Sequence, residues 1–409
     1  MKSNHNAYNT LTCLTWLLKI FSLNSNFEHS TNSTFLLVKS VLTAIAFDSL
    51  AFYSLCHFIS NAYSGVNISI KLAEIVQIIY DICQYSVDLI FVNKYGRHIS
   101  IEYFKQYDNI DKILGVTNYC SLRRRLLKLI IVFTLIWMIS ASFDFAAWVR
   151  EYGWVTPAIY GVTYIYLYIK VLTTLDLTSH IMNIEIRLKT IGDLVQDYYS
   201  TADCYPGLIG DSILCSKNWL YTKTSSQISD LKKQNNPLQL ISFNNHHEVK
   251  WLTRCYLMLI EQVAYINSMY GIRILLNSLS LLIDMVRFTN LGVRLLIGSQ
   301  RTINESGYFP AFSSLLHLLT CVAVLISLVD HCEQTYSQRV RIIRFIDHLL
   351  INKNPDDDLR SAIKELRELV QNHPVTFNMA NFFTLNYSLL MSIASVVVTY
   401  TIILLQSVK

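Results

Sequence analysis

Long apolar segments recur along the chain and are separated by polar connections. Seven of them are about 20 residues or longer, the length that an α-helix needs to cross the hydrocarbon core of a bilayer. They lie at 35–61, 66–92, 127–149, 154–177, 268–291, 311–331 and 384–407. This pattern predicts an all-α integral membrane protein with seven transmembrane helices.

Three further segments have their own patterns. Residues 11–23 are apolar but too short to span, and they lack the basic start and cleavage site of a signal peptide, so we expect an interfacial or packed helix. Residues 196–245 are rich in Ser, Asn, Gln and Asp, which predicts a flexible insert. Residues 356–372 begin with three acids, which favour a helix start over a metal site. Apolar residues then recur at helical spacing: Leu359, Ile363, Leu366 and Val370.

Composition agrees with a membrane protein. Only 15% of the residues are charged, against about 25% in soluble domains, and the mean hydropathy is +0.33. The nine cysteines are scattered singly, without the paired spacing of a zinc site. Phosphate-loop, dinucleotide-binding, HExxH and GxSxG motifs do not occur. We therefore predict no enzymatic activity, no cofactor, no metal site and no nucleic-acid partner.

Basic residues predict the orientation, because Lys and Arg concentrate in cytoplasmic loops. Connections 93–126, 178–267 and 332–383 hold seven, eight and seven of them, whereas the alternate connections together hold only Arg150, Arg294 and Arg301. We predict a cytoplasmic N-terminus and an extracellular C-terminus with cytoplasmic helical extensions. This orientation is opposite to that of a G-protein-coupled receptor.

The second predicted span carries one polar face. At 100° per residue its five polar positions fall within an arc about 80° wide. They are Glu74, Gln77, Asp81, Gln84 and Asp88. Charged groups in a span face a bundle interior or a watery cavity. Two interpretations are equally supported: the external half, Glu74 to Asp81, lines a ligand pocket, or the face is a hydrogen-bonded seam between helices.

The external halves of the other spans supply further candidates for a ligand site. The third span places Trp137, Ser140, Asp144 and Trp148 on one side, and all but Trp137 lie in its external half, although interfacial Trp belts produce the same residues. Tyr160 and Tyr164 lie one turn apart on the fourth span, and His317 lies in the sixth. Asp284 and Arg287 are spaced to pair with each other, which we favour over direct ligand contact.

The last span carries a narrow polar column. Its members fall within about 40° of Ser388 around the helix axis. They are Ser388, Ser392, Ser395, Thr399 and Gln406. Small hydroxyls suit an aqueous pore, but they also allow close helix packing. One such helix cannot enclose a channel, so a pore requires several subunits around a symmetry axis.

The same segment resembles a family signature. Thr399-Tyr400, five mainly hydrophobic residues and Gln406 resemble the carboxy-terminal motif of insect gustatory receptors, in which Phe usually follows Gln and Ser407 stands here. Thr401 occupies the position where the sugar-sensing branch typically has Glu, which disfavours that branch. The resemblance in architecture runs over the whole chain, and the motif is confined to its end.

The resemblance implies a homotetrameric or heterotetrameric, ligand-gated cation channel. In such a channel the seventh helix would line the pore, with Gln406 at the constriction and Ser407 beside it. Leu405 or Ile402 would supply a hydrophobic plug in place of the usual Phe. Small-molecule tastants would bind an external pocket, and the partners would be the bilayer, permeant cations and related subunits.

The combined prediction is a multi-pass gustatory receptor in the plasma membrane of a sensory-neuron dendrite, with bitter or other non-sugar ligands. A cytoplasmic segment at 1–34 would precede a ligand-sensing bundle at 35–331, cytoplasmic anchor helices at 332–383 and the pore helix with a short tail at 384–409. The alternatives are a fructose-like sugar receptor, an odorant-receptor channel subunit and a metabotropic seven-helix receptor.

Overall fold

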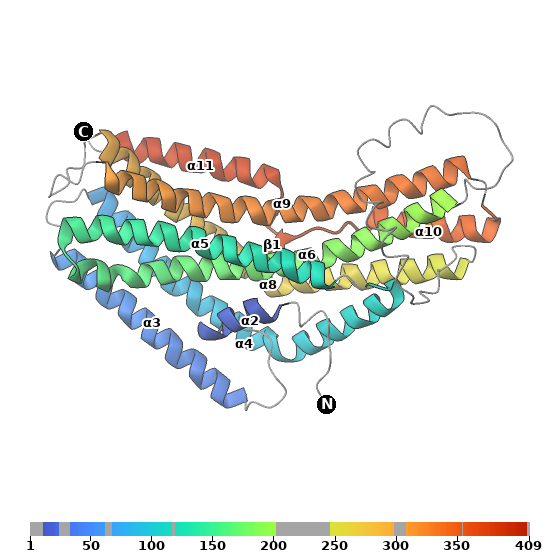
Figure 1. Ribbon diagram of the computed structural model, residues 1–409, viewed down its shortest axis with the longest axis horizontal. Coiled ribbons are helices and arrows are strands. Elements are labelled where there is room, and N and C mark those ends of the chain that lie inside the picture. The colour runs from blue at the N-terminus through green and yellow to red at the C-terminus, as the bar shows by residue number, and fades with distance from the viewer. Residues whose placement is uncertain are drawn as a thin grey trace.

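Long helices make up most of the protein (Figure 1). The computed structural model describes residues 11–23, 33–61, 68–116, 119–201, 246–297, 308–353 and 355–406. Its helices are α2 (Thr12–Ile20), α3 (Ser33–Asn61), α4 (Ile68–Leu114), α5 (Tyr119–Tyr152), α6 (Val155–Thr201), α8 (His246–Ile297), α9 (Phe309–Asn352), α10 (Asp357–Asn372) and α11 (Tyr387–Gln406). A two-stranded antiparallel hairpin, β1 (Asn378–Met379) and β2 (Phe383–Thr384), precedes α11.

The seven predicted spans are confirmed as helices. Among the described residues, six helices are long and apolar enough to cross a membrane, namely α3, α4, α5, α6, α8 and α9. Helix α11 is the seventh, with a shorter apolar stretch at Tyr387–Ile403. The direction in which the spans run stays a prediction.

Four of these helices continue well beyond a bilayer thickness. Helices α4, α6, α8 and α9 have 47, 47, 52 and 44 residues, where about 20 suffice to span. The far ends of α8 and α9 pack against α10 in a second bundle at the right of Figure 1.

Helix α10 confirms the amphipathic pattern found in the sequence. Its apolar stripe is buried against α8 and α9: Leu359, Ile363, Leu366 and Val370. Arg339 of α9 donates hydrogen bonds of 2.9 Å to the carbonyl oxygens of Val370 and Gln371 in the last turn of α10. The acids of the first turn lie where the helix dipole favours negative charge.

The short apolar segment near the start of the chain, expected to be an interfacial or packed helix, forms a helix with one side packed on the bundle. Leu14 and Leu18 of α2 are buried, and the hydroxyl of Tyr85 on α4 donates to the carbonyl of Phe21 just after α2. Most of the insert predicted at 196–245 lies outside the described residues, although α6 runs on to Thr201.

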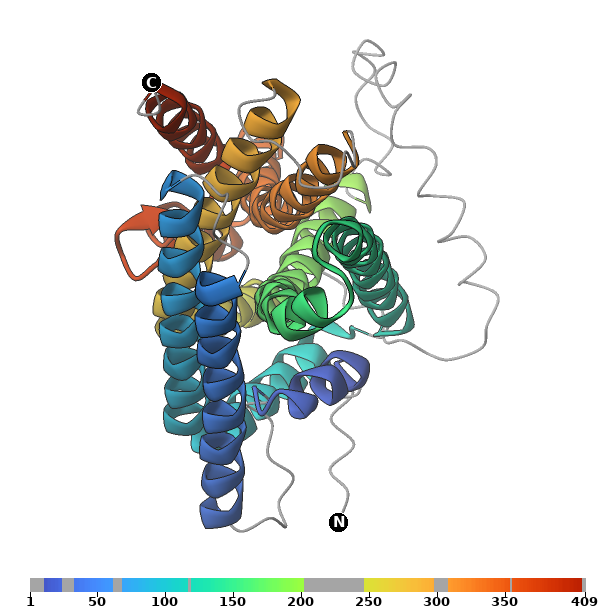
Figure 2. The same ribbon diagram turned by 90° about the vertical axis from the view of Figure 1, so that its left-hand side faces the viewer.

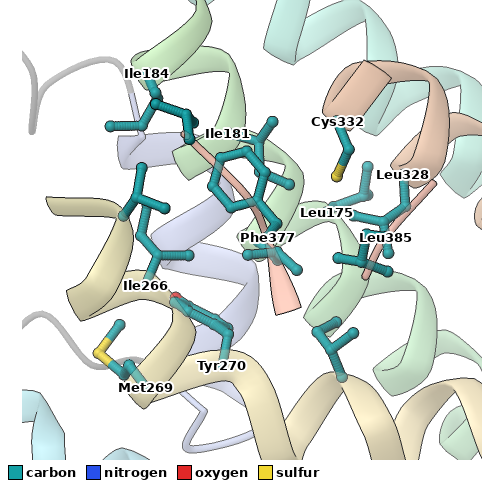
Figure 3. Close-up of a cluster of buried hydrophobic side chains, with 14 of the residues drawn as sticks. Leu175, Ile181, Ile184, Ile266, Met269, Tyr270, Leu328, Cys332, Phe377 and Leu385 are labelled. Atoms are coloured by element: carbon teal, nitrogen blue, oxygen red, sulfur yellow. The ribbon is translucent and has the colours of Figure 1, made fainter. Parts of the chain in front are cut away.

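The chain between α10 and α11 enters the middle of the protein. Figure 3 shows Phe377 among side chains of three helices, including Ile181 of α6, Ile266 of α8 and Leu328 of α9. Its amide donates to the hydroxyl of Tyr336 at 3.0 Å. This segment anchors the start of α11 in the core.

Helix α11 lies at the edge of the bundle, against α8 and α9 (Figure 2). Leu389, Ile393 and Val397 pack onto the core, and Thr401 is buried. The side of the helix that carries Ser388, Ser392, Ser395 and Thr399 is exposed in this single chain.

Candidate functional site

A small polar cavity lies inside the bundle, near the end at which α4, α6 and α9 begin and α5 and α8 end. Its volume is about 10 Å³, room for roughly one water molecule. Eleven residues line it: Asp81, Asp144, Tyr160, Thr163, Tyr164, Leu167, Lys170, Asp284, Arg287, Phe288 and His317. Helices α4, α5, α6, α8 and α9 all contribute, so the cavity exists only in the assembled bundle.

Lys170 of α6 lies at the centre of the charged groups. Its ammonium is 2.7 Å from Asp81 of α4 and 2.5 Å from Asp284 of α8, and the residue is 1% exposed. Gln77 and Ser280 also donate to Asp81, at 2.7 and 2.8 Å. These contacts tie three helices together, because a buried charge without partners is costly.

Arg287 forms a second ionic cluster one turn from Asp284. Its guanidinium is 3.0 Å from Glu74 and 3.4 Å from Asp284, so the Asp284–Arg287 pair predicted from the sequence is confirmed. The hydroxyl of Tyr160 also donates to Glu74, at 2.7 Å. The guanidinium lies 4.3 Å from the centre of the Phe288 ring, close enough for a cation–π contact.

Asp144 of α5 has different partners. It accepts hydrogen bonds of 2.6 Å from the hydroxyls of Tyr164 and Ser313. The Nε2 atom of His317 is 3.7 Å away, and Nδ1 of the same ring hydrogen-bonds Ser140 at 2.7 Å. The imidazole stacks on Phe288, with ring centres 4.8 Å apart. This wall of the cavity is aromatic and carries one carboxylate.

The structure brings most of the candidate ligand residues together. Six line the cavity: Asp81, Asp144, Tyr160, Tyr164, Asp284 and His317. Three more candidates do not line the cavity but hydrogen-bond residues that do: Glu74 bonds Tyr160, Gln77 bonds Asp81 and Ser140 bonds His317.

The two tryptophans among the candidates do not line the cavity. Trp137 donates to the carbonyl of Tyr164 and stacks on Tyr168 at 4.3 Å. The ring centre of Trp148 lies 6.3 Å from that of Tyr160. Both tryptophans pack between helices. Each contacts a tyrosine that lines the cavity, Trp137 at Tyr164 and Trp148 at Tyr160.

The polar face of α4 borders the cavity at one point and forms a hydrogen-bonded seam farther along, and its role in ligand binding stays a prediction. Asp81 lines the cavity. Farther along the helix, Gln84 donates to Asn277 at 2.8 Å and Asp88 pairs with Arg273 at 2.9 Å. All five polar residues of the face are buried, as expected of charges in a span. One part borders a cavity and the other is a seam.

Sequence analysis missed several of the lining residues. Lys170 is the central one, and its signal was a lone cation within an apolar stretch of α6. Thr163, Leu167 and Phe288 carry no signal that separates them from ordinary helix residues. The same holds for Ser313, which donates to Asp144 but lies in a stretch of sequence that does not distinguish it from other serines.

The polar column of α11 lies on the exposed side of that helix. Its members are exposed in the single chain: Ser388, Ser392, Ser395, Thr399 and Gln406. At 100° per residue, the packing residues Leu389, Ile393 and Val397 lie about 100–180° from Ser388, on the opposite side. Tyr400 and Ile402 are about half exposed and Leu405 is partly buried. Ser407 lies outside the described residues.

Within the part of the chain that the structure describes, no group of three His, Cys, Asp or Glu side chains is placed to hold a metal ion. The carboxylates of the cavity are engaged with Lys170, Arg287 and hydroxyl groups. The chemistry that these side chains offer is ion pairing and hydrogen bonding.

A family model described as 7tm chemosensory receptor matches residues 95–409, most of the chain. The protein belongs to this family of insect gustatory and odorant receptors. No curated protein sequence matches this chemosensory receptor significantly.

Solved structures confirm the fold of this chemosensory receptor. The insect olfactory receptor OR5 from Machilis hrabei in complex with eugenol matches with a TM-score of 0.56 and 13% identity, covering 98% of this chain and 99% of that one. The structure of the same receptor described without a ligand matches with a TM-score of 0.55 and 14% identity, covering 97% of each chain. At such identities the likeness shows the fold alone.

Proposed function

We propose that this chemosensory receptor is a gustatory receptor that acts as a tastant-gated, non-selective cation channel. The observation that carries the proposal is the exposed hydroxyl column of α11. The apolar face of α11 packs on its own chain, and Ser388, Ser395 and Thr399 face away from it. A pore helix needs this division, because one side must be anchored and the other must meet water.

Several copies of the chain are needed to close such a pore. One α11 supplies only one wall, so a tetramer around a symmetry axis would bring four columns together. Related subunits would serve equally well in a heterotetramer. The second bundle around α10 would anchor the subunits on the cytoplasmic side, where the basic connections place it.

The polar cavity would receive the tastant. Binding that is tighter in the open state than in the closed state shifts the gating equilibrium toward opening. Helix α8 provides a physical connection, because it lines the cavity through Asp284 and Arg287 and also packs against the hairpin and α11. Bitter and other non-sugar compounds are proposed because Thr401 stands where the sugar-sensing branch has Glu.

Cysteine substitution along α11 tests the channel. The full chain is expressed in cells, and currents are recorded before and after a membrane-impermeant cationic thiol reagent. Ser392→Cys, Ser395→Cys and Thr399→Cys should each lose current on treatment. Ala394→Cys is the matched control, since Ala394 is also exposed but about 120° from the column.

The outcome is read against the untreated chain and its native cysteines, of which Cys13, Cys56, Cys83 and Cys120 are exposed. Equal effects at Ala394 and at the column positions would contradict a pore on this face. Gln406→Ala should also alter gating or permeation. Wild-type currents in that variant would count against a constriction at Gln406.

An odorant-receptor channel subunit is the second candidate, because the family that the chain belongs to includes odorant receptors as well as gustatory receptors. It would share the topology and would require a co-receptor. Agonist-evoked currents from this chain expressed alone support the gustatory proposal, and currents that appear only with a co-receptor support the alternative.

A further inference from the structure

Carboxylates outnumber lysine and arginine side chains around the cavity. Three carboxylates, those of Glu74, Asp81 and Asp284, share the two cations Lys170 and Arg287. Asp144 is a fourth carboxylate, and no Lys or Arg of the described residues pairs with it within 4.0 Å. The buried site therefore places four carboxylates beside one lysine, one arginine and His317, whose imidazole is charged only when protonated.

The partners of Asp144 leave it able to accept another donor. Tyr164 and Ser313 each donate one neutral hydroxyl hydrogen bond. A carboxylate offers about four acceptor positions, so two hydroxyls do not fill it. Asp144 is 7% exposed, and a buried carboxylate gains most from a cationic partner.

His317 marks the open side of Asp144. Its Nε2 atom is directed at the carboxylate from 3.7 Å, makes no hydrogen bond among the described residues, and belongs to a side chain that is 1% exposed. The gap between this nitrogen and Asp144 is too long for a hydrogen bond. A donor that enters here would meet both groups.

The walls around Asp144 suit an organic cation. Phe288 and Tyr164 both stack on the His317 imidazole, with ring centres 4.8 and 5.9 Å from it. Aromatic faces attract ammonium groups and cover their hydrocarbon parts. The ligand must move side chains, since the cavity of about 10 Å³ holds only about one water. Tyr164 is the side chain that would move to make room, because it lines the cavity and bonds Asp144, whereas Ser313 bonds Asp144 without lining the cavity.

We infer that the tastant site takes a small aromatic amine, whose ammonium nitrogen pairs with Asp144 in place of the Tyr164 hydroxyl. The inference rests on the proposed function for the consequence of binding, and on the cavity alone for the chemistry. It differs from a general preference for non-sugar compounds, because neutral molecules of the same shape are predicted to bind poorly.

Pairs of amine and alcohol test the ligand class directly. Phenethylamine is compared with 2-phenylethanol, and tryptamine with tryptophol, by equilibrium binding to the full-length protein in lipid nanodiscs. Each pair has the same hydrocarbon skeleton, so the difference reports the charge. The amine should bind at least about tenfold more tightly, as expected of one charge-assisted hydrogen bond. Equal affinity within both pairs, or no binding of either amine, would overturn the inference.

Two variants locate the charge. Asp144→Asn should remove the preference for the amine while it keeps an oxygen acceptor for the hydroxyls. Asp48→Asn is the matched control, because Asp48 on α3 also accepts from a tyrosine and a serine, at 2.9 and 3.5 Å, and does not line the cavity. A preference that survives in Asp144→Asn, or is lost equally in Asp48→Asn, contradicts the assignment. If Asp144→Asn does not fold, the wild-type comparison still decides the ligand class.

Currents separate this inference from the proposed function. Tight amine binding without current in the tetramer supports the ligand site and contradicts the channel. Currents evoked equally by the alcohols and the amines support the channel and contradict the amine site.

Discussion

The backbone of α8 at Gly271 lies directly against the hairpin backbone at Ala380. A Cβ atom at position 271 would be 2.9 Å from the amide nitrogen of Ala380 and 3.3 Å from the carbonyl oxygen of Asn378. Asn267, one turn earlier, bonds the same segment: it donates to the carbonyl of Thr376 at 2.9 Å and accepts from the amide of Asn378 at 3.0 Å. This contact joins a helix of the cavity to the segment that leads into α11.

Gly271→Ala should displace the hairpin, because both close atoms belong to the backbone and cannot rotate away. We expect a loss of about 1–3 kcal/mol of stability and a lower melting temperature in fluorescence-detected size exclusion. Gly161→Ala is the control, since a Cβ there meets nothing within 4 Å and alanine favours a helix. A Gly271→Ala protein as stable as Gly161→Ala would contradict the close contact.

Lys170→Met should destabilise the bundle more than any surface substitution. It leaves Asp81 and Asp284 as buried carboxylates without the ammonium that joins them, a change that costs about 3–5 kcal/mol. Melting temperature measures the loss. Lys189→Met on the same helix is exposed and should stay within about 0.5 kcal/mol of wild type. A stable Lys170→Met protein would show that the two carboxylates do not depend on Lys170.

Arg187→Lys should weaken the long part of α4 against α6. The guanidinium pairs with Asp111 at 2.6 Å, donates to the carbonyl of Asn183 at 2.7 Å and lies 4.0 Å from the Tyr107 ring centre. A lysine ammonium cannot make all three contacts, so we expect a loss of about 1–3 kcal/mol. Thermal unfolding of Arg124→Lys, an exposed site on α5, gives the baseline. Equal melting points would refute the prediction.

Arg339→Gln should loosen the end of α10. Arg339 supplies donors to the last-turn carbonyls of Val370 and Gln371, which have no partner within the helix. Hydrogen exchange of residues 369–373 should accelerate by about fivefold or more, as expected of about 1 kcal/mol of lost local stability. Arg344→Gln, on an exposed face of α9, should leave this exchange unchanged. Unchanged exchange in Arg339→Gln would rule out the cap.

The spacing of apolar residues along the chain was sufficient to predict where the helices lie. Length and hydropathy located every span, and helical spacing located α10 with its buried Leu359, Ile363, Leu366 and Val370. These features are local, since each depends on residues within a few turns of one another. The prediction of an interfacial or packed helix in residues 11–23 also succeeded, since a helix forms there and buries Leu14 and Leu18.

Only part of the candidate site could be predicted from the sequence. The polar face of α4 and the acid Asp144 were found because charges are rare in apolar helices. Their partners were not, because Lys170 and Ser313 are about 90 and 170 residues away from Asp81 and Asp144 in the sequence and spacing along one helix carries no information on its neighbours. The hairpin before α11 was also missed, since strands of two residues carry no periodic signal.

The sequence alone determined that this protein is a bundle of membrane-spanning helices. Lipid offers no hydrogen-bond partners, and a single apolar segment can pair all of its own backbone N–H and C=O groups only by forming an α-helix. Only the tertiary structure decided which buried charges meet, that Asp144 is left without a Lys or Arg partner among the described residues, and that the hydroxyl column of α11 faces away from its own chain. Those outcomes depend on how the helices rotate and approach one another, and that arrangement is fixed by side chains far apart in the sequence.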